Sequence, residues 1–196
     1  MCHNFYQQPG GEDQVFYDEA KAFEERGHKV IVYTRHNDDV KKMSGLALAA
    51  SVIWSRRTYR EVRLLLREHH PDIVQVYNMF PLISPSVFHA ARAESVPAVW
   101  GLNNQRLMCP SSNFTLKGKL CTACLGKPFA CPGVWHRCYR GSLLFTLGIA
   151  LASAWHRWFG KNTVGGYIAS TQFYKDLFIR HRLPADKIHV KQHMVA

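Results

Sequence analysis

The stretch Pro71-Asp-Ile-Val-Gln-Val-Tyr77 decides the fold class, because it is a β-branched run that begins at a helix-breaking proline. Residues 56–69, just before it, place Val62, Leu65 and Leu66 at helical spacing with arginines outside them. The pattern predicts a helix that ends before Pro71 and a buried strand after it. A helix that leads into a short buried strand is the repeating unit of an α/β protein.

The same alternation continues on both sides of this unit. Helical spacing favours helices over 12–27, 84–94, 142–159 and 171–181, the last one capped by Ser170. Short apolar runs favour strands at Lys29–Thr34, Val96–Leu102, Gly166–Ala169 and Lys187–Val190. Such strands pair in parallel through right-handed crossovers. We therefore predict one doubly wound, mostly parallel, Rossmann-like α/β domain over 1–196, with a Cys-rich loop insertion at about 103–141.

Both ends of this domain are short. A doubly wound domain usually begins with a strand that leads into a glycine-rich turn. Only Met1–Phe5 precedes Gly10-Gly11, and we expect this segment to be too short for a full buried strand. The last predicted strand lies close to the other end of the chain. We expect both ends to be cut relative to the complete fold.

The composition is that of a globular protein with a strong basic excess. Hydrophobic residues make up 47% and charged residues 20%, which excludes a disordered chain. The net charge of +11 favours an acidic membrane surface or phosphorylated small molecules as partners, unless it serves solubility alone. Nucleic acid is not expected, because the basic residues are not gathered on one element with stacking aromatics.

Neither a secretory leader nor a membrane span is expected. The opening segment Met1–Gly11 is polar, and the apolar run Leu143–Trp155 is shorter than the roughly 20 residues that a spanning helix needs. We therefore expect a cytoplasmic protein. In that compartment cysteines stay reduced.

Two polar motifs lie where open α/β sheets bind ligands. Pro9-Gly10-Gly11-Glu12-Asp13 precedes a helix, so its glycines allow close approach of a phosphate or sugar hydroxyl to the helix N-terminus. Asn103-Asn104-Gln105-Arg106 follows a predicted strand and supplies donors for hydroxyls or a diphosphate. The alternatives are a simple Gly-Gly turn and a turn at Asn103-Asn104 followed by a solvated Arg106.

Five cysteines fall in or near the predicted insertion. Cys121-Thr-Ala-Cys124 is a pair whose spacing chelates a tetrahedral ion, and Cys109 and Cys138 would complete a structural zinc site. Cys131 or His136 are substitutes for one of these ligands. Zinc would order an insertion that lacks a core of its own. Reduced free thiols and disulfides remain the alternatives.

The stretch Leu143–Lys161 is apolar and aromatic, with basic residues around it. Its aromatic residues are Phe145, Trp155, Trp158 and Phe159, and its basic neighbours are Arg140, Arg157 and Lys161. We expect a helix that packs on the sheet and leaves an aromatic-basic end exposed. Tryptophan beside cations also suits a membrane interface.

With these residues in view, the chain resembles the N-terminal domain of family-4 glycosyltransferases. The resembling stretches are His3–Asp13, Glu25–Thr34, His70–Asn78, Val96–Val99, Arg106–Pro110, Cys121–Ser142, Ile168–Thr171 and Lys187–Val190. They are spread over nearly the whole chain, and their order and spacing together are specific.

The resemblance implies half of a two-domain GT-B enzyme. The N-terminal Rossmann-like domain holds a glycan or lipid-linked acceptor, and a C-terminal domain binds the nucleotide-sugar donor. Transfer retains the anomeric configuration and needs no catalytic metal or other cofactor. Gly10 and Gly11 would face the donor phosphates and the acceptor, with Asn104 and Arg106 on the acceptor side. An acceptor on a lipid diphosphate would place the protein peripherally on the inner membrane face.

Two departures from the family pattern bear on activity. The family commonly has His-Asn where this chain has Asn103-Asn104, and Asn does not change its protonation state. The resemblance stops at Met194-Val195-Ala196, so we expect the donor-binding C-terminal domain, with its paired glutamates, to be absent. The isolated chain is expected to be inactive alone, a catalytic residue is not assigned, and a missing donor-binding domain or subunit is the expected partner. The alternative is a degenerate, non-catalytic domain that binds an anionic membrane surface or a partner protein.

Overall fold

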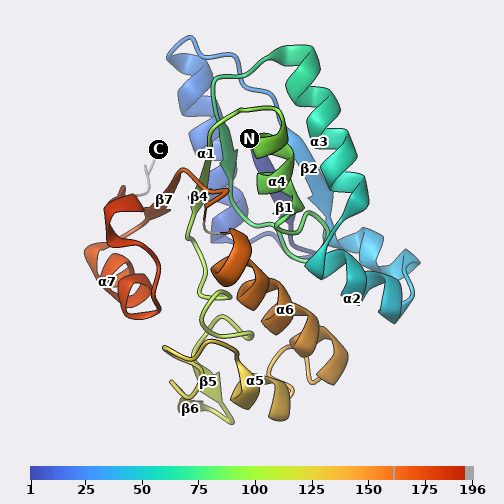
Figure 1. Cartoon of the computed structure of the whole chain (residues 1–196), viewed down its shortest axis with the longest axis vertical. Coiled ribbons are helices and arrows are strands. Elements are labelled where there is room, and N and C mark those ends of the chain that lie inside the picture. Colours follow the sequence, from blue (N-terminus) through green and yellow to red (C-terminus); the bar gives the residue numbers. More distant parts are fainter. Residues whose placement is uncertain (161, 193–196) are drawn as a thin grey trace.

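The computed structural model describes residues 1–160 and 162–192, and its centre is a six-stranded sheet (Figure 1). The strands lie in the order β2-β1-β3-β4-β7-β8, and each neighbouring pair is parallel. Their bounds are β1 Cys2–Phe5, β2 Tyr33–His36, β3 Val74–Val76, β4 Ala98–Gly101, β7 Gly166–Ala169 and β8 Ile188–Val190. The predicted Rossmann-like α/β fold is confirmed.

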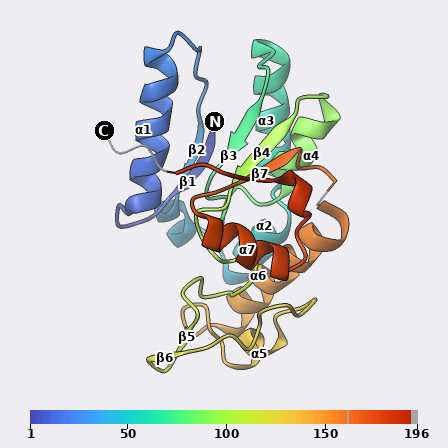
Figure 2. The ribbon, with the colours of Figure 1, turned by 90° about the vertical axis from the view of Figure 1, so that its left-hand side faces the viewer.

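Helices connect these strands and cover both faces of the sheet. The α-helices are α1 Gly11–Glu25, α2 Gly45–Ile53, α3 Arg56–His69, α4 Ser86–Ala93, α5 Cys131–Trp135, α6 Leu143–Trp155 and α7 Gln172–Arg180. The shorter helical segments are η1 Asn37–Lys42, η2 His156–Gly160 and η3 Ala185–Lys187. Helix α1 lies on one side of the sheet, and α3 and α4 lie together on the other side (Figure 2). This arrangement is doubly wound.

A central part of the core lies between the sheet and the helical layer that contains α3 and α4. Phe88 of α4 is fully buried and lies 5.3 Å, centroid to centroid, from the ring of Trp100 on β4. His156 and Tyr167 complete this aromatic group, with the His156 Nε2 and the Tyr167 hydroxyl 3.0 Å apart. Buried aromatic contacts of this kind fix β4, β7 and the end of α6 relative to one another.

The prediction for the first segment is wrong. Cys2–Phe5 forms β1, which lies inside the sheet between β2 and β3 and has buried residues at Cys2, His3 and Asn4. Four residues suffice because both neighbours supply hydrogen bonds. The Tyr77 and Asn4 amides, for example, donate across the β1–β3 pair, to the carbonyls of Cys2 and Asn78 at 3.0 and 2.8 Å.

Several predicted boundaries also move. The strand expected at Lys29–Thr34 lies instead at Tyr33–His36. The long helix expected over 142–159 ends as an α-helix at Trp155 and continues as a π-helical turn, η2. The cap of α7 is Thr171 rather than Ser170, because the Thr171 side chain accepts from the Tyr174 amide at 3.2 Å.

The predicted insertion has regular structure of its own. It holds a small antiparallel hairpin, β5 Thr115–Leu116 and β6 Lys119–Leu120, and the short helix α5. In both views it lies at one end of the molecule, beside α6 (Figures 1 and 2). Sequence analysis also did not predict α2, whose largely apolar sequence lacks a clear period.

No helix among the described residues is both long and apolar enough to cross a membrane. Lys161 and Met194–Ala196, which the sequence predictions included, lie outside the described residues, as does the side chain of Phe159.

Candidate functional site

The order in which the chain adds strands to the sheet reverses beside β1. From β1 the chain crosses outward to β2 and then returns to the other side of β1 as β3. In open parallel sheets, ligands bind at such a switch point, outside the carboxyl ends of the strands. The β1–α1 loop with Gly10, the residue Asn78 after β3 and the segment after β4 all lie at this edge.

The loop that carries Gly10 and Gly11, called the glycine loop below, is held in place by the buried pair of His3 and Asp13. The Gly10 amide donates to Asp13 Oδ2 at 3.1 Å, so Asp13 caps the start of α1. The other carboxylate oxygen, Asp13 Oδ1, lies 2.7 Å from Nε2 of His3, which is fully buried on β1. The position of Gly10 is therefore fixed by a side chain of the central sheet.

Nothing inside the domain requires glycine at these two positions. Gly10 has an extended backbone with φ of −131°, and Gly11 is the first residue of α1. A Cβ atom built on either residue would have no neighbour within 4 Å. The space above the loop is open, and the positive end of the α1 dipole lies beside it.

A polar network joins this loop to the segment after β4. Arg106 Nη1 donates to the Tyr6 hydroxyl at 2.9 Å, and that hydroxyl donates to Glu12 Oε2 at 2.7 Å. Asn104 Nδ2 donates to Glu12 Oε1 at 3.2 Å. Arg106 Nη1 also lies 3.4 Å from Asn78 Oδ1. Of the predicted site residues, Asn104 thus contacts the first turn of α1 directly, and Arg106 reaches it through the Tyr6 hydroxyl.

The network holds one fixed positive charge. Burial disfavours the charge of Arg106, but Tyr6, Tyr139 and Glu12 outweigh burial and raise the pKa of the guanidinium above its ordinary value. Burial, together with Glu12, raises the pKa of the Tyr6 phenol, which stays protonated. Arg106 Nε is buried and has no hydrogen-bond partner among the described residues. Buried donors rarely stay unpaired, so this atom is an unsatisfied polar group within the network.

Asn103 lies apart from this network. Its Nδ2 atom is buried without a hydrogen-bond partner in the part of the chain that the structure describes. A Cβ on Gly101 would lie 3.4 Å from that atom, so the amide turns back toward β4. The structure therefore brings Asn104 and Arg106 together with the glycine loop but does not join Asn103 to them.

Tyr6, Asn78 and the buried pair of His3 and Asp13 also belong to this site, and the sequence patterns did not predict their roles. The sequence could have indicated Asn78 as a site residue, because it directly follows a predicted strand at the edge where such sheets bind ligands. No sequence pattern indicates Tyr6, since its partner Arg106 lies 100 residues away along the chain.

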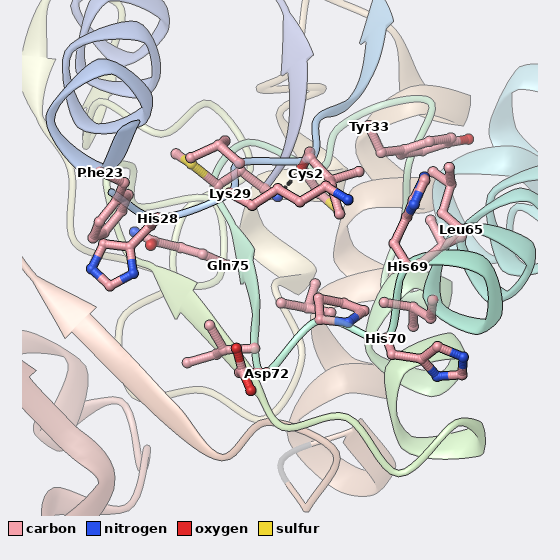
Figure 3. Close-up of a pocket in the computed structure, with 18 residues that line it drawn as sticks. Cys2, Phe23, His28, Lys29, Tyr33, Leu65, His69, His70, Asp72 and Gln75 are labelled. Atoms are coloured by element: carbon pink, nitrogen blue, oxygen red, sulfur yellow. Dashed lines mark hydrogen bonds between the residues drawn. The ribbon is translucent and has the colours of Figure 1, made fainter. Parts of the chain in front are cut away.

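A separate cavity of about 390 Å³ lies at the opposite edge of the sheet (Figure 3). Residues that precede or begin β1, β2 and β3 line it, together with Phe23 of α1 and Leu65 and His69 of α3. Because this is the amino edge of a parallel sheet, it is not the edge where such folds place their ligand sites. The cavity does not include any of the predicted site residues.

The four cysteines predicted as metal ligands lie around one small cavity. Cys109, Cys121, Cys124 and Cys138 all line it, and His136 does so as well. Cys131, the other substitute ligand, is exposed and does not line it. All the cysteines are free thiols.

The doubly wound parallel sheet defines a Rossmann-like domain, and the polar network at its switch point is a candidate ligand site at the carboxyl edge. The family model of glycosyltransferase family 4 matches residues 9–195, and the chain belongs to this family. No match was found among the curated proteins.

Proposed function

We propose that this domain is the acceptor-binding half of a retaining glycosyltransferase. It transfers a sugar from a nucleotide sugar to a glycan or lipid-linked acceptor, and a second domain or subunit binds the donor. The observation that supports this most is the Arg106–Tyr6–Glu12–Asn104 network beside an open glycine loop. Family membership supports sugar transfer as the reaction class.

Each residue of the network has a defined task in this proposal. Arg106 supplies a permanent charge for the hydroxyls or phosphate of the acceptor. Gly10 and Gly11 leave room for the donor phosphates, which approach from the facing domain. Asn103, in the place of the family histidine, offers hydrogen bonds only. The reaction requires no catalytic metal.

The experiment supplies the donor half. The chain is joined to, or mixed with, a donor-binding domain of a family-4 enzyme, and release of nucleoside diphosphate is measured from a panel of nucleotide sugars with a polyprenyl-diphosphate-linked sugar as acceptor. The chain alone should show little or no turnover. Turnover by the pure chain, or equal turnover after Gly11→Ala, contradicts the proposal.

Gly11→Ala is a clean test because the domain itself tolerates it. The added methyl group meets no neighbour, and alanine in a helix is more favourable than glycine by up to about 1 kcal/mol. A loss of transfer without a loss of stability therefore reports on a ligand near the loop. Arg106→Ala should weaken acceptor binding about tenfold or more. Arg60→Ala, at an exposed position of α3, is the matched control.

A second candidate function is binding to an anionic membrane surface. One face of α6 packs on α2, with Gly148 against Ala49 and Val52. Beside this contact, an outward stripe carries Leu144, Leu151, Trp155 and Trp158, which are 38, 40, 41 and 57% exposed. Their spacing of seven, four and three residues places them on one stripe, since η2 continues the helix.

The charge around this stripe fits an anionic surface. Residues 95–175 contain nine Lys or Arg and no Asp or Glu. An apolar, Trp-bearing stripe with surrounding cations is the pattern of a helix that lies in a membrane interface. This function either accompanies a lipid-linked acceptor or stands alone in a non-catalytic domain.

Vesicle sedimentation tests the membrane candidate. The chain should sediment with anionic vesicles at low salt, and Leu151→Ser with Trp158→Ser should lower the bound fraction several-fold. Leu64→Ser, an exposed apolar position on α3, is the control. Absence of binding at low salt contradicts this candidate but leaves the acceptor proposal standing.

A further inference from the structure

The cysteine cavity brings together three separate segments of the chain. Cys109 lies after β4, Cys121 and Cys124 follow the β5–β6 hairpin, and Cys138 follows α5. The cavity itself has a volume of about 10 Å³, so the four side chains surround a space near the size of a single small ligand. Convergence of four thiols from three segments calls for a physical reason.

The local backbone is built to bring these side chains together. The hairpin turns at Lys117 and Gly118, both with positive φ, as a tight hairpin turn requires. It returns the chain so that the Cys121 amide donates to the Phe114 carbonyl at 2.6 Å. The Cys138 amide donates to the Gly133 carbonyl at 3.0 Å and fixes the last thiol of the group.

Gly133 permits the closest approach inside this cluster. A Cβ atom at this position would lie 2.9 Å from Pro110 Cγ and 3.3 Å from Cys124 Sγ. Helix α5 therefore packs directly on the Cys109–Pro110 segment and on the Cys124 thiol. A side chain of any size would separate the segments that carry the cysteines.

The insertion has little apolar core of its own, although Leu107 and Met108 are buried in the main core and Phe114, Leu125 and Tyr139 pack against it. Its separate buried cluster consists of Cys124, Ala130 and Ala150, with only Phe129 and Val134 packed against it. A segment of about 40 residues with so little core usually needs a disulfide or a metal for stability. Every cysteine here is a free thiol.

The residue types available select the kind of ligand. Because residues 95–175 contain no Asp or Glu, thiols and imidazoles are the strong side-chain ligands for a transition metal in this region. Cys109, Cys121, Cys124 and Cys138 line the same cavity, so the four thiols lie near one another. A soft, four-thiolate set is typical of structural zinc.

We propose that Cys109, Cys121, Cys124 and Cys138 close around one Zn²⁺ ion as a tetrahedral structural site. No three Cys, His, Asp or Glu side chains in residues 1–160 and 162–192 are already placed to hold a metal, so the ion draws the thiols inward. The thiols lose their protons on binding, and the ion compensates the buried negative charge. Cys131 and His136 stay outside the coordination.

The site also bears on the acceptor network. Cys109 lies three residues after Arg106, in the segment that carries Asn104. Its amide donates to the Gln105 carbonyl at 2.8 Å, which ties the thiol to that segment. Metal binding would therefore stabilise the segment that carries Asn104 and Arg106 as well as the insertion.

Metal content and cobalt spectroscopy test the proposal without any activity measurement. The full chain, purified under reducing conditions from zinc-supplemented medium, should contain about one zinc ion per molecule. Cys121→Ser and Cys138→Ser should lower this to a small fraction, while Cys131→Ser keeps it. Cobalt in place of zinc should give the ligand-field spectrum of a tetrahedral tetrathiolate.

Each contrary result overturns a stated part of the proposal. A folded chain without zinc, or disulfides among the four cysteines by mass spectrometry, overturns the metal site. Equal loss of zinc in Cys131→Ser overturns the assignment of ligands, and a cobalt spectrum with an imidazole ligand would replace one thiolate by His136. If the serine variants do not fold, the cobalt spectrum of the unaltered chain still shows whether four thiolates bind the ion: a spectrum without tetrathiolate character overturns the site.

Discussion

His181 joins three parts of the domain and should make it sensitive to acid. The residue is 1% exposed and follows the last turn of α7. The Gly126 amide of the insertion donates to Nδ1 at 3.1 Å, and Nε2 lies 2.9 Å from the Leu107 carbonyl. Because a carbonyl only accepts, Nε2 carries the proton and Nδ1 is the acceptor. The imidazole is therefore neutral, with both nitrogens paired.

Protonation would place a second N–H against the Gly126 amide. Burial, with Arg157 and Arg182, lowers the pKa of His181 to about 4, although the hydrogen bond to the Leu107 carbonyl opposes them. In the unfolded chain the pKa returns to about 6.5. As the pH falls below 6.5, the unfolded state takes up a proton that the folded state does not, so stability is lost between about pH 6.5 and pH 4.

The size of the effect follows from the difference in pKa. At pH 5 the free energy of unfolding falls by about 2 kcal/mol because of His181 alone. Burial also lowers the pKa of His156, to about 3, with further contributions from His89 and Arg157. His156 therefore contributes about another 2 kcal/mol at pH 5 by the same reasoning.

Urea unfolding at a series of pH values measures this loss. His181→Gln retains an acceptor for Gly126 and a donor for Leu107 but does not titrate. Between pH 7.5 and pH 5 the unaltered chain should lose about 4 kcal/mol and His181→Gln about 2 kcal/mol. His189→Gln, at an exposed position of β8, is the control. Equal losses in the unaltered chain and His181→Gln would refute the reasoning.

Three further predictions concern stability. Phe88→Ala should lower the free energy of unfolding by about 3–5 kcal/mol, because a fully buried ring leaves a cavity beside Trp100; a loss below 1 kcal/mol in urea unfolding contradicts this. Gly133→Ala should lower the free energy of unfolding by about 1–3 kcal/mol, because its methyl group would overlap Pro110. Gly148→Ala meets only ordinary contacts and should be neutral or stabilising. A lower midpoint of thermal unfolding for Gly148→Ala than for Gly133→Ala refutes both predictions. Tyr6→Phe removes the hydroxyl that bridges Arg106 and Glu12 and should cost about 1 kcal/mol by the same assay, and an unchanged midpoint would show that the bridge is not stabilising.

Local sequence patterns predict much of this fold. The helix over 56–69 coincides with α3, because its apolar stripe and Pro71 are both local signals. The strand segments at 72–77 and 96–102 contain β3 and β4, and Asn104 and Arg106 lie at the expected edge. That edge follows from parallel pairing, which the alternation of helices and strands already implies.

The tertiary structure alone decides how distant segments meet. β1 is stable as a four-residue strand only because β2 and β3 pair with it, and its own sequence does not carry that information. The Tyr6–Arg106 bridge joins residues 100 apart, and the cysteine cavity joins three segments. Periodicity reports which face of an element is apolar, whereas these contacts depend on where whole elements pack. The sequence therefore determined the fold class and the edge that carries the site, and the packing of distant elements decided which side chains share it.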